Sequence, residues 1–227
     1  MKRWSETHEA YTAAELREAH PEGFDAAREQ HAAWEWEDGY IVESTLDDLV
    51  DNVLPALGLT GGFSPRDGLS WSLSSFPVPG EYVRLNRTLY VEGRDWFFRA
   101  VTAGESDAAD YSRAASPVTI DCRSRLWQRT EITFDRDGAH VEIVDAEDLD
   151  NTAYNALADQ ADALTDALTE WIGDVLNHAV DVTHDEYDYQ TSVARFLDAT
   201  EANDWYFDAR GHIVTPPPEA IDTERED

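Results

Sequence analysis

The sequence is almost without lysine and cysteine, and it has no long apolar run. Lys2 is the only lysine, and 17 cationic residues stand against 48 aspartates and glutamates, for a formal net charge of -31. Binding to nucleic acid requires basic clusters, so we expect no direct contact with nucleic acid. Cys122 is the single cysteine, which excludes an internal disulfide and suits a cytoplasmic protein. No run approaches the roughly 18 apolar residues of a membrane span, so we expect a soluble protein that does not bind membranes.

The excess of acidic residues has two explanations that the sequence leaves open. Hydrophobic residues make up 42% of the chain and aromatic residues 11%, so the charge belongs on a folded surface and not on a disordered chain. One explanation is adaptation to the salty cytoplasm of a halophilic host, where salt screens the repulsion between carboxylates. The other is mimicry of DNA, in which carboxylates stand in for phosphates.

Residues 12–57 are expected to form helices. Thr12 and Glu15 have the spacing of a capping box, Pro21 suits a first helical turn, and Ser44 is expected to open a helix that Gly58 ends.

Residues 58–145 are expected to be mainly sheet. The glycine-rich segment GLTGGFSPRDGLSWSLSSF has neither a P-loop nor a dinucleotide-binding pattern. Its apolar residues alternate with serines around Trp71, which predicts a strand, and Asp67-Gly68 is expected to be a hairpin turn back to a strand at 59–63. A hairpin is also predicted around Asp137-Gly138. Further strands are expected at 118–123 and 83–91, whereas 102–116 is predicted to be an exposed loop.

A long amphipathic helix is expected from Asp150 onward, within a helical region at 150–203, with a small hairpin at 204–214. The proline-rich and charged tail 215–227 is expected to be disordered. Together these segments predict one α+β domain over 1–214, in which the long helix packs against an antiparallel sheet of four to five strands and helices form the N-terminal part.

The sequence shows no catalytic constellation, and we expect no metal and no cofactor. Ser70 lacks the glycine context of a nucleophile elbow, and Cys122 falls on the apolar face of its predicted strand. His178 and His184 are six residues apart, so a continuous helix would place them on different faces. The segment HDEYD, which begins at His184, is interpreted as a solvated acidic turn.

Two surfaces remain as candidates for binding. Arg123 and Arg125 would project from one strand face, where they could hold an anionic ligand or nucleotide, but the favoured interpretation is that they neutralise neighbouring helix carboxylates. The second surface is an acidic stripe along the long helix, opposite its apolar face, for which a solvated surface is the favoured interpretation and an interface with a basic partner is the alternative. Its carboxylates are roughly 5 to 6 Å apart, comparable to phosphates along a nucleic-acid strand. The stripe comprises Asp159, Asp162, Asp166, Glu170 and Asp174.

Two regions resemble an uncharacterised family carried by tailed phages and plasmids. The first is the FS-x-x-DG-x-x-F/W segment, and the second is a C-terminal pattern with a Tyr-Asp-Tyr segment and an Ala-Asn-x-Trp/Tyr-x-Phe ending. The matching positions are Phe63, Ser64, Asp67, Gly68, Trp71, Trp171, Tyr187, Tyr189, Ala202, Asn203, Phe207 and Gly211. Members are often labelled antitoxins of toxin-antitoxin stability systems, so the resemblance implies an accessory protein of a mobile element.

The sequence therefore favours a non-enzymatic factor that binds a protein, in a virus or plasmid of a halophilic host. Antitoxin-like activity, counter-defence activity and DNA mimicry are versions of this hypothesis. The alternative is an enzyme or a protein that binds a small molecule or nucleotide through Arg123 and Arg125. The oligomeric state and the partner's identity stay open.

Overall fold

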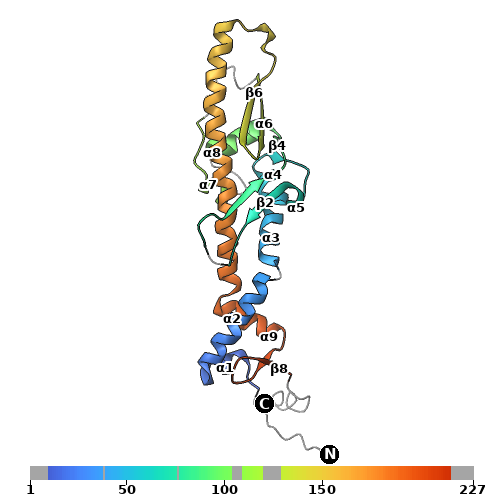
Figure 1. The fold of residues 1–227 in the computed structure, drawn as a ribbon, viewed down its shortest axis with the longest axis vertical. Helices are drawn as coiled ribbons and strands as arrows, with labels where there is room; N and C mark the ends of the chain where they lie inside the picture. Colours follow the sequence, from blue (N-terminus) through green and yellow to red (C-terminus); the bar gives the residue numbers. More distant parts are fainter. Residues whose placement is uncertain (1–9, 38, 76, 104–108, 120–128, 216–227) are drawn as a thin grey trace, which may run out of the picture. The chain divides into compact units, whose positions relative to one another are not determined.

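The computed structural model describes residues 10–37, 39–75, 77–103, 109–119 and 129–215. Its fold is α+β, as predicted: an antiparallel four-stranded sheet is followed by a long helix, and helices form the N-terminal part (Figure 1). Contacts divide the chain into two compact units. We call Val42–His184 the central unit, and the residues up to Ile41 together with those from Asp185 the terminal unit. Each unit has its own apolar core.

The terminal unit packs two N-terminal helices against a C-terminal helix. The predicted capping box is confirmed: the Glu15 amide donates to Thr12 Oγ1, and the Thr12 amide donates to the Glu15 carboxylate. Phe196 and Phe207 anchor the core of this unit and are each 1% exposed. The elements are α1 (Ala13–Ala19), α2 (Pro21–Glu37), α9 (Val193–Ala202), β7 (Tyr206–Phe207) and β8 (Ile213–Val214), and the last two pair antiparallel where a hairpin is predicted.

The four-stranded sheet of the central unit has the order β1-β4-β5-β6. The hairpin predicted around Asp137-Gly138 is confirmed, because Asp135 lies opposite Gly138 and the register continues to Thr130 opposite Ile143. Gly138 has a φ of 119°, a conformation that glycine adopts without strain. The strands are β1 (Leu59–Thr60), β4 (Leu89–Val91), β5 (Thr130–Asp135) and β6 (Gly138–Ile143).

The prediction that Asp67-Gly68 is a hairpin turn is wrong. Pro65–Gly68 form a single helical turn, α5, in which the amides of Asp67 and Gly68 donate to the carbonyl of Ser64. Proline at the first helical position favours this turn. The flanking strands do not pair with each other: β1 pairs with β4, whereas β2 (Leu69–Ser72) pairs with β3 (Tyr82–Leu85) in a separate two-stranded sheet. The single strand predicted at 83–91 is therefore two strands, β3 and β4.

Glycines in this segment make room for an aromatic ring. A Cβ atom at Gly68 would lie 1.8 Å from the ring of Phe63, and one at Gly61 would lie 2.1 Å from it. Both distances are far inside van der Waals contact, so the ring occupies the space that side chains would need. Packing against the Phe63 ring therefore explains why Gly61 and Gly68 are glycines.

Helices occupy more of the central unit than the sequence predicts. α3 (Tyr40–Asp48) starts before Ser44 and continues through a π-helical stretch (Leu49–Val53) into α4 (Leu54–Ala56), and Gly58 with a φ of 76° follows, as expected. α6 (Arg94–Ala103) is missed by the sequence. The exposed loop predicted at 102–116 is also wrong for the residues that the structure describes. Helix α7 (Ala109–Ala114) lies there, and its Tyr111 is 6% exposed and belongs to the core.

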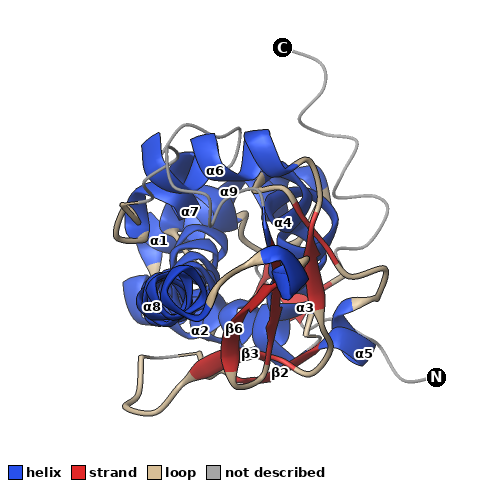
Figure 2. Ribbon diagram, turned by 90° about the horizontal axis from the view of Figure 1, so that it is seen from above, coloured by secondary structure: helices blue, strands red, loops and turns tan. Residues whose placement is uncertain are grey.

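The long helix α8 (Asn151–Gln190) confirms the predicted amphipathic helix. Its apolar face is buried, and the ring of Trp171 packs edge-on against Phe97 at a centroid distance of 5.7 Å. Residues of α8 and the strands belong to one core, and α8 lies beside the strands of the central unit (Figure 2). The amide of Ala139 in β6 donates to Thr169 Oγ1, which ties the edge of the sheet to α8. The HDEYD segment lies inside α8, so the turn predicted there is wrong.

Candidate functional site

The predicted acidic stripe lies on α8 with four of its five carboxylates exposed: Asp159, Asp162, Asp166 and Glu170. We call these four residues the acidic row. Within the part of the chain that the structure describes, no hydrogen bond or ion pair engages any of their carboxylates. Neighbours at these helical steps have Cβ atoms roughly 5 to 6 Å apart. The row therefore presents closely spaced negative charge that no arginine among the described residues neutralises.

Asp174 does not share this environment. It is half-buried, and its Oδ2 accepts a hydrogen bond of 3.3 Å from the backbone amide of Ser116, 58 residues away in sequence. The role of Asp174 is therefore to hold the segment after α7 against α8. Periodicity placed it on the stripe, but the contact with Ser116 depends on tertiary structure.

Glu81 carries the most strongly perturbed carboxylate of the central unit. Its side chain is 7% exposed, and its Oε1 accepts from the amide and the hydroxyl of Ser74 at 2.7 and 2.8 Å. Its Oε2 accepts from the Val78 amide, and His184 Nε2 lies 3.0 Å from the same oxygen. Burial would raise the pKa of Glu81, but the hydrogen bonds outweigh it and lower the pKa to about 2. This carboxylate fastens the loop after β2 to α8.

A cleft of about 340 Å³ follows the outer edge of β3, between the β5–β6 turn and α8. Because the Asn86 amide donates to the Gly68 carbonyl, the register makes Ser70–Arg84 a hydrogen-bonded pair. The backbone groups of Val83 and Leu85 consequently point away from β2. The rim has mixed charge: Arg84 lies over the ring of Tyr82 at 4.4 Å, and Arg136 is flanked by Asp135 and Asp137. The rim therefore offers both cationic and anionic groups to a ligand.

A groove of about 500 Å³ lies in the terminal unit, between the start of α1 and the end of α9. Glu201 and Asp204 are exposed on it, and Trp205 and Tyr206 are half-buried beside them. None of the lining residues is cationic. The remaining ones are apolar or carry a hydroxyl group: Thr12, Ala13, Ala14, Leu197 and Thr200. No local sequence pattern indicates this groove, because its two sides are far apart in the chain.

A buried histidine lies in the core of the terminal unit. His31 is 4% exposed and packs edge-on against Phe196, and its Nε2 lies 3.4 Å from a carboxylate oxygen of Glu35. Burial lowers the pKa of His31, and the nearby positive charge of Arg195 lowers it further, while Glu35 acts in the opposite direction. Its Nδ1 atom has no hydrogen-bond partner among the described residues.

The positions of the family pattern serve mainly to build the fold. Trp171, which is 2% exposed, and Phe207 are core residues, and Trp71 is half-buried in β2. Asn203 caps α9 by donating from its side chain to the Ala199 carbonyl. Ser64 and Asp67 form α5, where the Ser64 hydroxyl donates to the Asp67 carboxylate.

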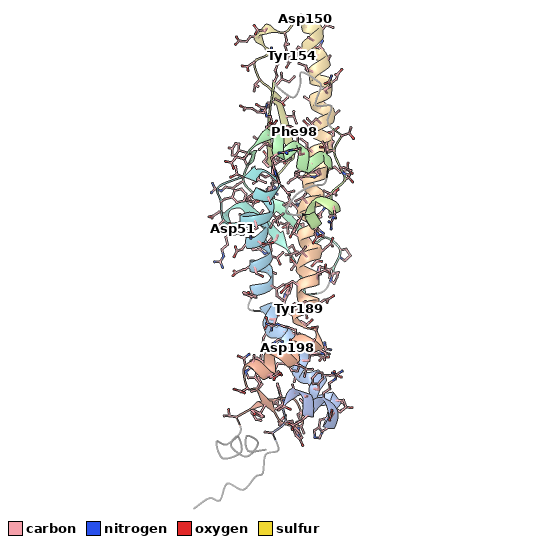
Figure 3. The ribbon with its side chains drawn as sticks, turned by 180° about the vertical axis from the view of Figure 1, so that it is seen from behind. Asp51, Phe98, Asp150, Tyr154, Tyr189 and Asp198 are labelled. Carbon is pink, nitrogen blue, oxygen red and sulfur yellow. The ribbon has the colours of Figure 1, made fainter. Side chains whose placement is uncertain are left out.

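The remaining positions of the pattern lie on or near α8 and in the C-terminal hairpin. Tyr187 packs edge-on against Trp36, whereas Tyr189 is 59% exposed (Figure 3). Gly211 has a φ of 88°, and a Cβ atom there would lie 2.1 Å from the Gly23 carbonyl oxygen, so only glycine fits.

The candidate anion-binding residues Arg123 and Arg125, and Cys122 with them, lie outside the described residues. Other candidates lie apart: Ser70 is in β2, and His178 packs edge-on against Tyr111 at 4.8 Å. The hollow of about 270 Å³ beside Gly61 and Gly62 has Asp51 as its only charged lining residue, which does not suit a phosphate.

Among the described residues, no group of three or more histidines, cysteines or carboxylates is arranged to hold a metal ion. In the same residues, no helix combines the length and the apolar character needed to cross a membrane. Comparison of the chain with family models, with curated proteins and with solved structures finds no match.

Proposed function

We propose that the protein is a non-enzymatic binding factor that engages a basic surface of a partner protein through the acidic row of α8. The observation that carries this proposal is the exposure of four carboxylates at successive helical steps, without a cationic partner among the described residues. The opposite, apolar face of α8 is buried in the core, so moving the helix away from the sheet would expose apolar side chains to water. The acidic row is therefore held on a rigid helix. Rigid presentation lowers the entropic cost of binding.

Charge complementarity favours a basic partner. The formal net charge of -31 favours cationic proteins over acidic ones and nucleic acids, and in molar salt this preference acts only over the few ångströms of direct contact. A partner that binds DNA has a surface suited to phosphates, and carboxylates carried on Cβ atoms roughly 5 to 6 Å apart could occupy such a surface. DNA mimicry is therefore one version of this function, with a nuclease or a toxin as the partner.

The biological setting follows from the sequence pattern. The near absence of lysine and the abundance of carboxylates support a halophilic host, and the resemblance in the Phe63–Trp71 and Trp171–Phe207 regions supports an accessory protein of a virus or plasmid. Under this proposal the protein acts as an antitoxin or against a host defence system. Its antitoxin or counter-defence role would consist of blocking the basic surface of the partner.

A second candidate function is the binding of a small molecule. The cleft along β3, with Arg84 and Arg136 on its rim and Val83 and Leu85 in its wall, is the observation that favours it. A thermal-shift screen with nucleotides and organic anions separates the candidates, because a ligand of the cleft raises the melting temperature by mass action. A shift that Arg84→Gln abolishes would support the cleft as the site.

The principal test compares two triple variants of equal charge. Asp162→Asn, Asp166→Asn and Glu170→Gln neutralise the row, whereas Asp47→Asn, Asp51→Asn and Glu92→Gln neutralise exposed carboxylates elsewhere in the central unit. Each protein is used to capture partners from host extract in molar salt. We expect a discrete protein to be captured by the wild type and by the control triple, and to be lost with the row triple. Equal capture by both triples would contradict the proposal.

A further inference from the structure

The groove of the terminal unit combines two kinds of group that recognise cations. Trp205 and Tyr206 are half-buried residues that line the groove, and the faces of aromatic rings attract ammonium and guanidinium groups. Glu201 and Asp204 supply two carboxylates on the same groove, one at the end of α9 and the other just after it. We propose that this groove binds an arginine or lysine side chain presented by a basic segment of a partner protein.

The lining leaves this cation without a competitor. None of the nine lining residues is lysine, arginine or histidine, and no ion pair involves Glu201 or Asp204 among the described residues. An aliphatic stem of the incoming side chain can lie against Leu197 and the exposed Ala14, while its charged end reaches the carboxylates. The volume of about 500 Å³ is enough for one long side chain and part of the adjoining backbone.

Charge excludes the other occupants of such a groove. An anionic ligand would meet two carboxylates and no cation, and a second copy of this chain would bring a net charge of -31 against an equal charge. A basic segment is attracted both by the whole molecule and by the groove. The groove lies in the terminal unit and the acidic row in the central unit, so an experiment can contradict the proposal for one without contradicting the proposal for the other.

Asp204 makes a conservative test possible. Its φ is 51°, a left-handed conformation that asparagine adopts nearly as readily as aspartate, so Asp204→Asn removes the charge with little strain. The test variant is Glu201→Gln with Asp204→Asn. A matched control is Asp198→Asn with Asp25→Asn, which removes two exposed carboxylates of the same unit that do not line the groove (Asp198 is labelled in Figure 3).

The experiment titrates the ¹⁵N-labelled full chain with N-acetyl-arginine amide, in the lowest salt at which circular dichroism shows the fold to be retained. N-acetyl-citrulline amide, which has a similar shape and no charge, is the control ligand. We expect saturable shifts of the amides of residues 200–206 and of the Trp205 indole. The affinity should fall at least about fivefold in the test variant and stay unchanged in the control variant. Tyr206→Leu should weaken binding about two- to fivefold without a change in charge.

Any of three results would overturn the proposal. One is a set of shifts spread over exposed carboxylates throughout the molecule, which would show a diffuse counterion effect. The second is equal weakening in the test and control variants, and the third is an equal response to N-acetyl-citrulline amide. Both substitutions of the test variant are at exposed positions, so the terminal unit should stay folded. Spectra of each variant without ligand check that it does, which separates lost binding from lost folding.

Discussion

Replacing Glu81 with glutamine should destabilise the central unit by about 3 kcal/mol at neutral pH. The carboxylate accepts from Ser74 and Val78 and contacts His184, and glutamine would place an amide donor against two of these donors. A folded-state pKa of about 2, against an ordinary value of 4.5, corresponds to about 3 kcal/mol at 1.36 kcal/mol per pKa unit. For a chain of this size, such a loss lowers the melting temperature by roughly 6 to 12 °C.

The destabilisation by Glu81→Gln should depend on pH in a direction that the pKa shift determines. The pKa of Glu81 is lower in the folded state than in the unfolded chain, so its contribution is complete above about pH 4.5 and disappears as the pH falls towards about 2. The difference in unfolding free energy between the wild type and Glu81→Gln should therefore be largest at pH 7 and shrink steadily between pH 4.5 and 2. Chemical denaturation at several pH values in molar salt measures it.

Glu92→Gln is the control, because Glu92 is an exposed carboxylate and surface substitutions of this kind change stability by no more than about 0.5 kcal/mol. A difference for Glu81→Gln below about 0.5 kcal/mol at pH 7, or one that is the same at pH 7 and pH 3, would refute the reasoning from the hydrogen bonds.

Three further predictions concern packing, pH and salt. Gly68→Ala should cost about 1 to 3 kcal/mol because of the Phe63 ring, whereas Gly173→Ala in α8, where a Cβ atom meets nothing within 4 Å, should stabilise by up to about 1 kcal/mol; equal effects in denaturant melts would contradict this. Burial lowers the pKa of His31 below its ordinary value of 6.5, so as the pH falls through that value the unfolded chain takes up the proton first and the free energy of unfolding decreases; His31→Phe should flatten that dependence, and an unchanged pH profile would count against it. Finally, circular dichroism should show a less stable fold in low salt than in molar salt, because unscreened carboxylates repel each other; equal stability would favour DNA mimicry over halophilic adaptation.

Local pattern and long-range contact explain which parts of the fold could be predicted. The amphipathic repeat through Leu164, Leu168 and Trp171 identifies α8, and the Thr12 capping box and the turn at Gly138 depend on neighbouring residues. The strand partners did not follow from pattern. Leu59 lies opposite Val91, and nothing local to either residue indicates that pairing.

The candidate sites divide in the same way. The four residues of the acidic row follow from helical spacing, because each depends only on the face of α8 that it occupies. Asp174 was assigned to the same surface, but its bond to Ser116 links positions 58 residues apart. The bond between Glu81 and His184 spans 103 residues, and the groove joins Thr12 to Trp205. Contacts at such separations need the fold itself.

The most direct test of the proposed function is the affinity of a captured partner for three proteins: the wild type, the row triple at Asp162, Asp166 and Glu170, and the control triple at Asp47, Asp51 and Glu92. We predict that the row triple weakens binding at least about tenfold and makes the affinity less dependent on salt, because each lost charge pair removes attraction that salt screens. The control triple should bind as the wild type does. Equal affinities for the two triples across the salt series would contradict the assignment of the acidic row as the binding surface.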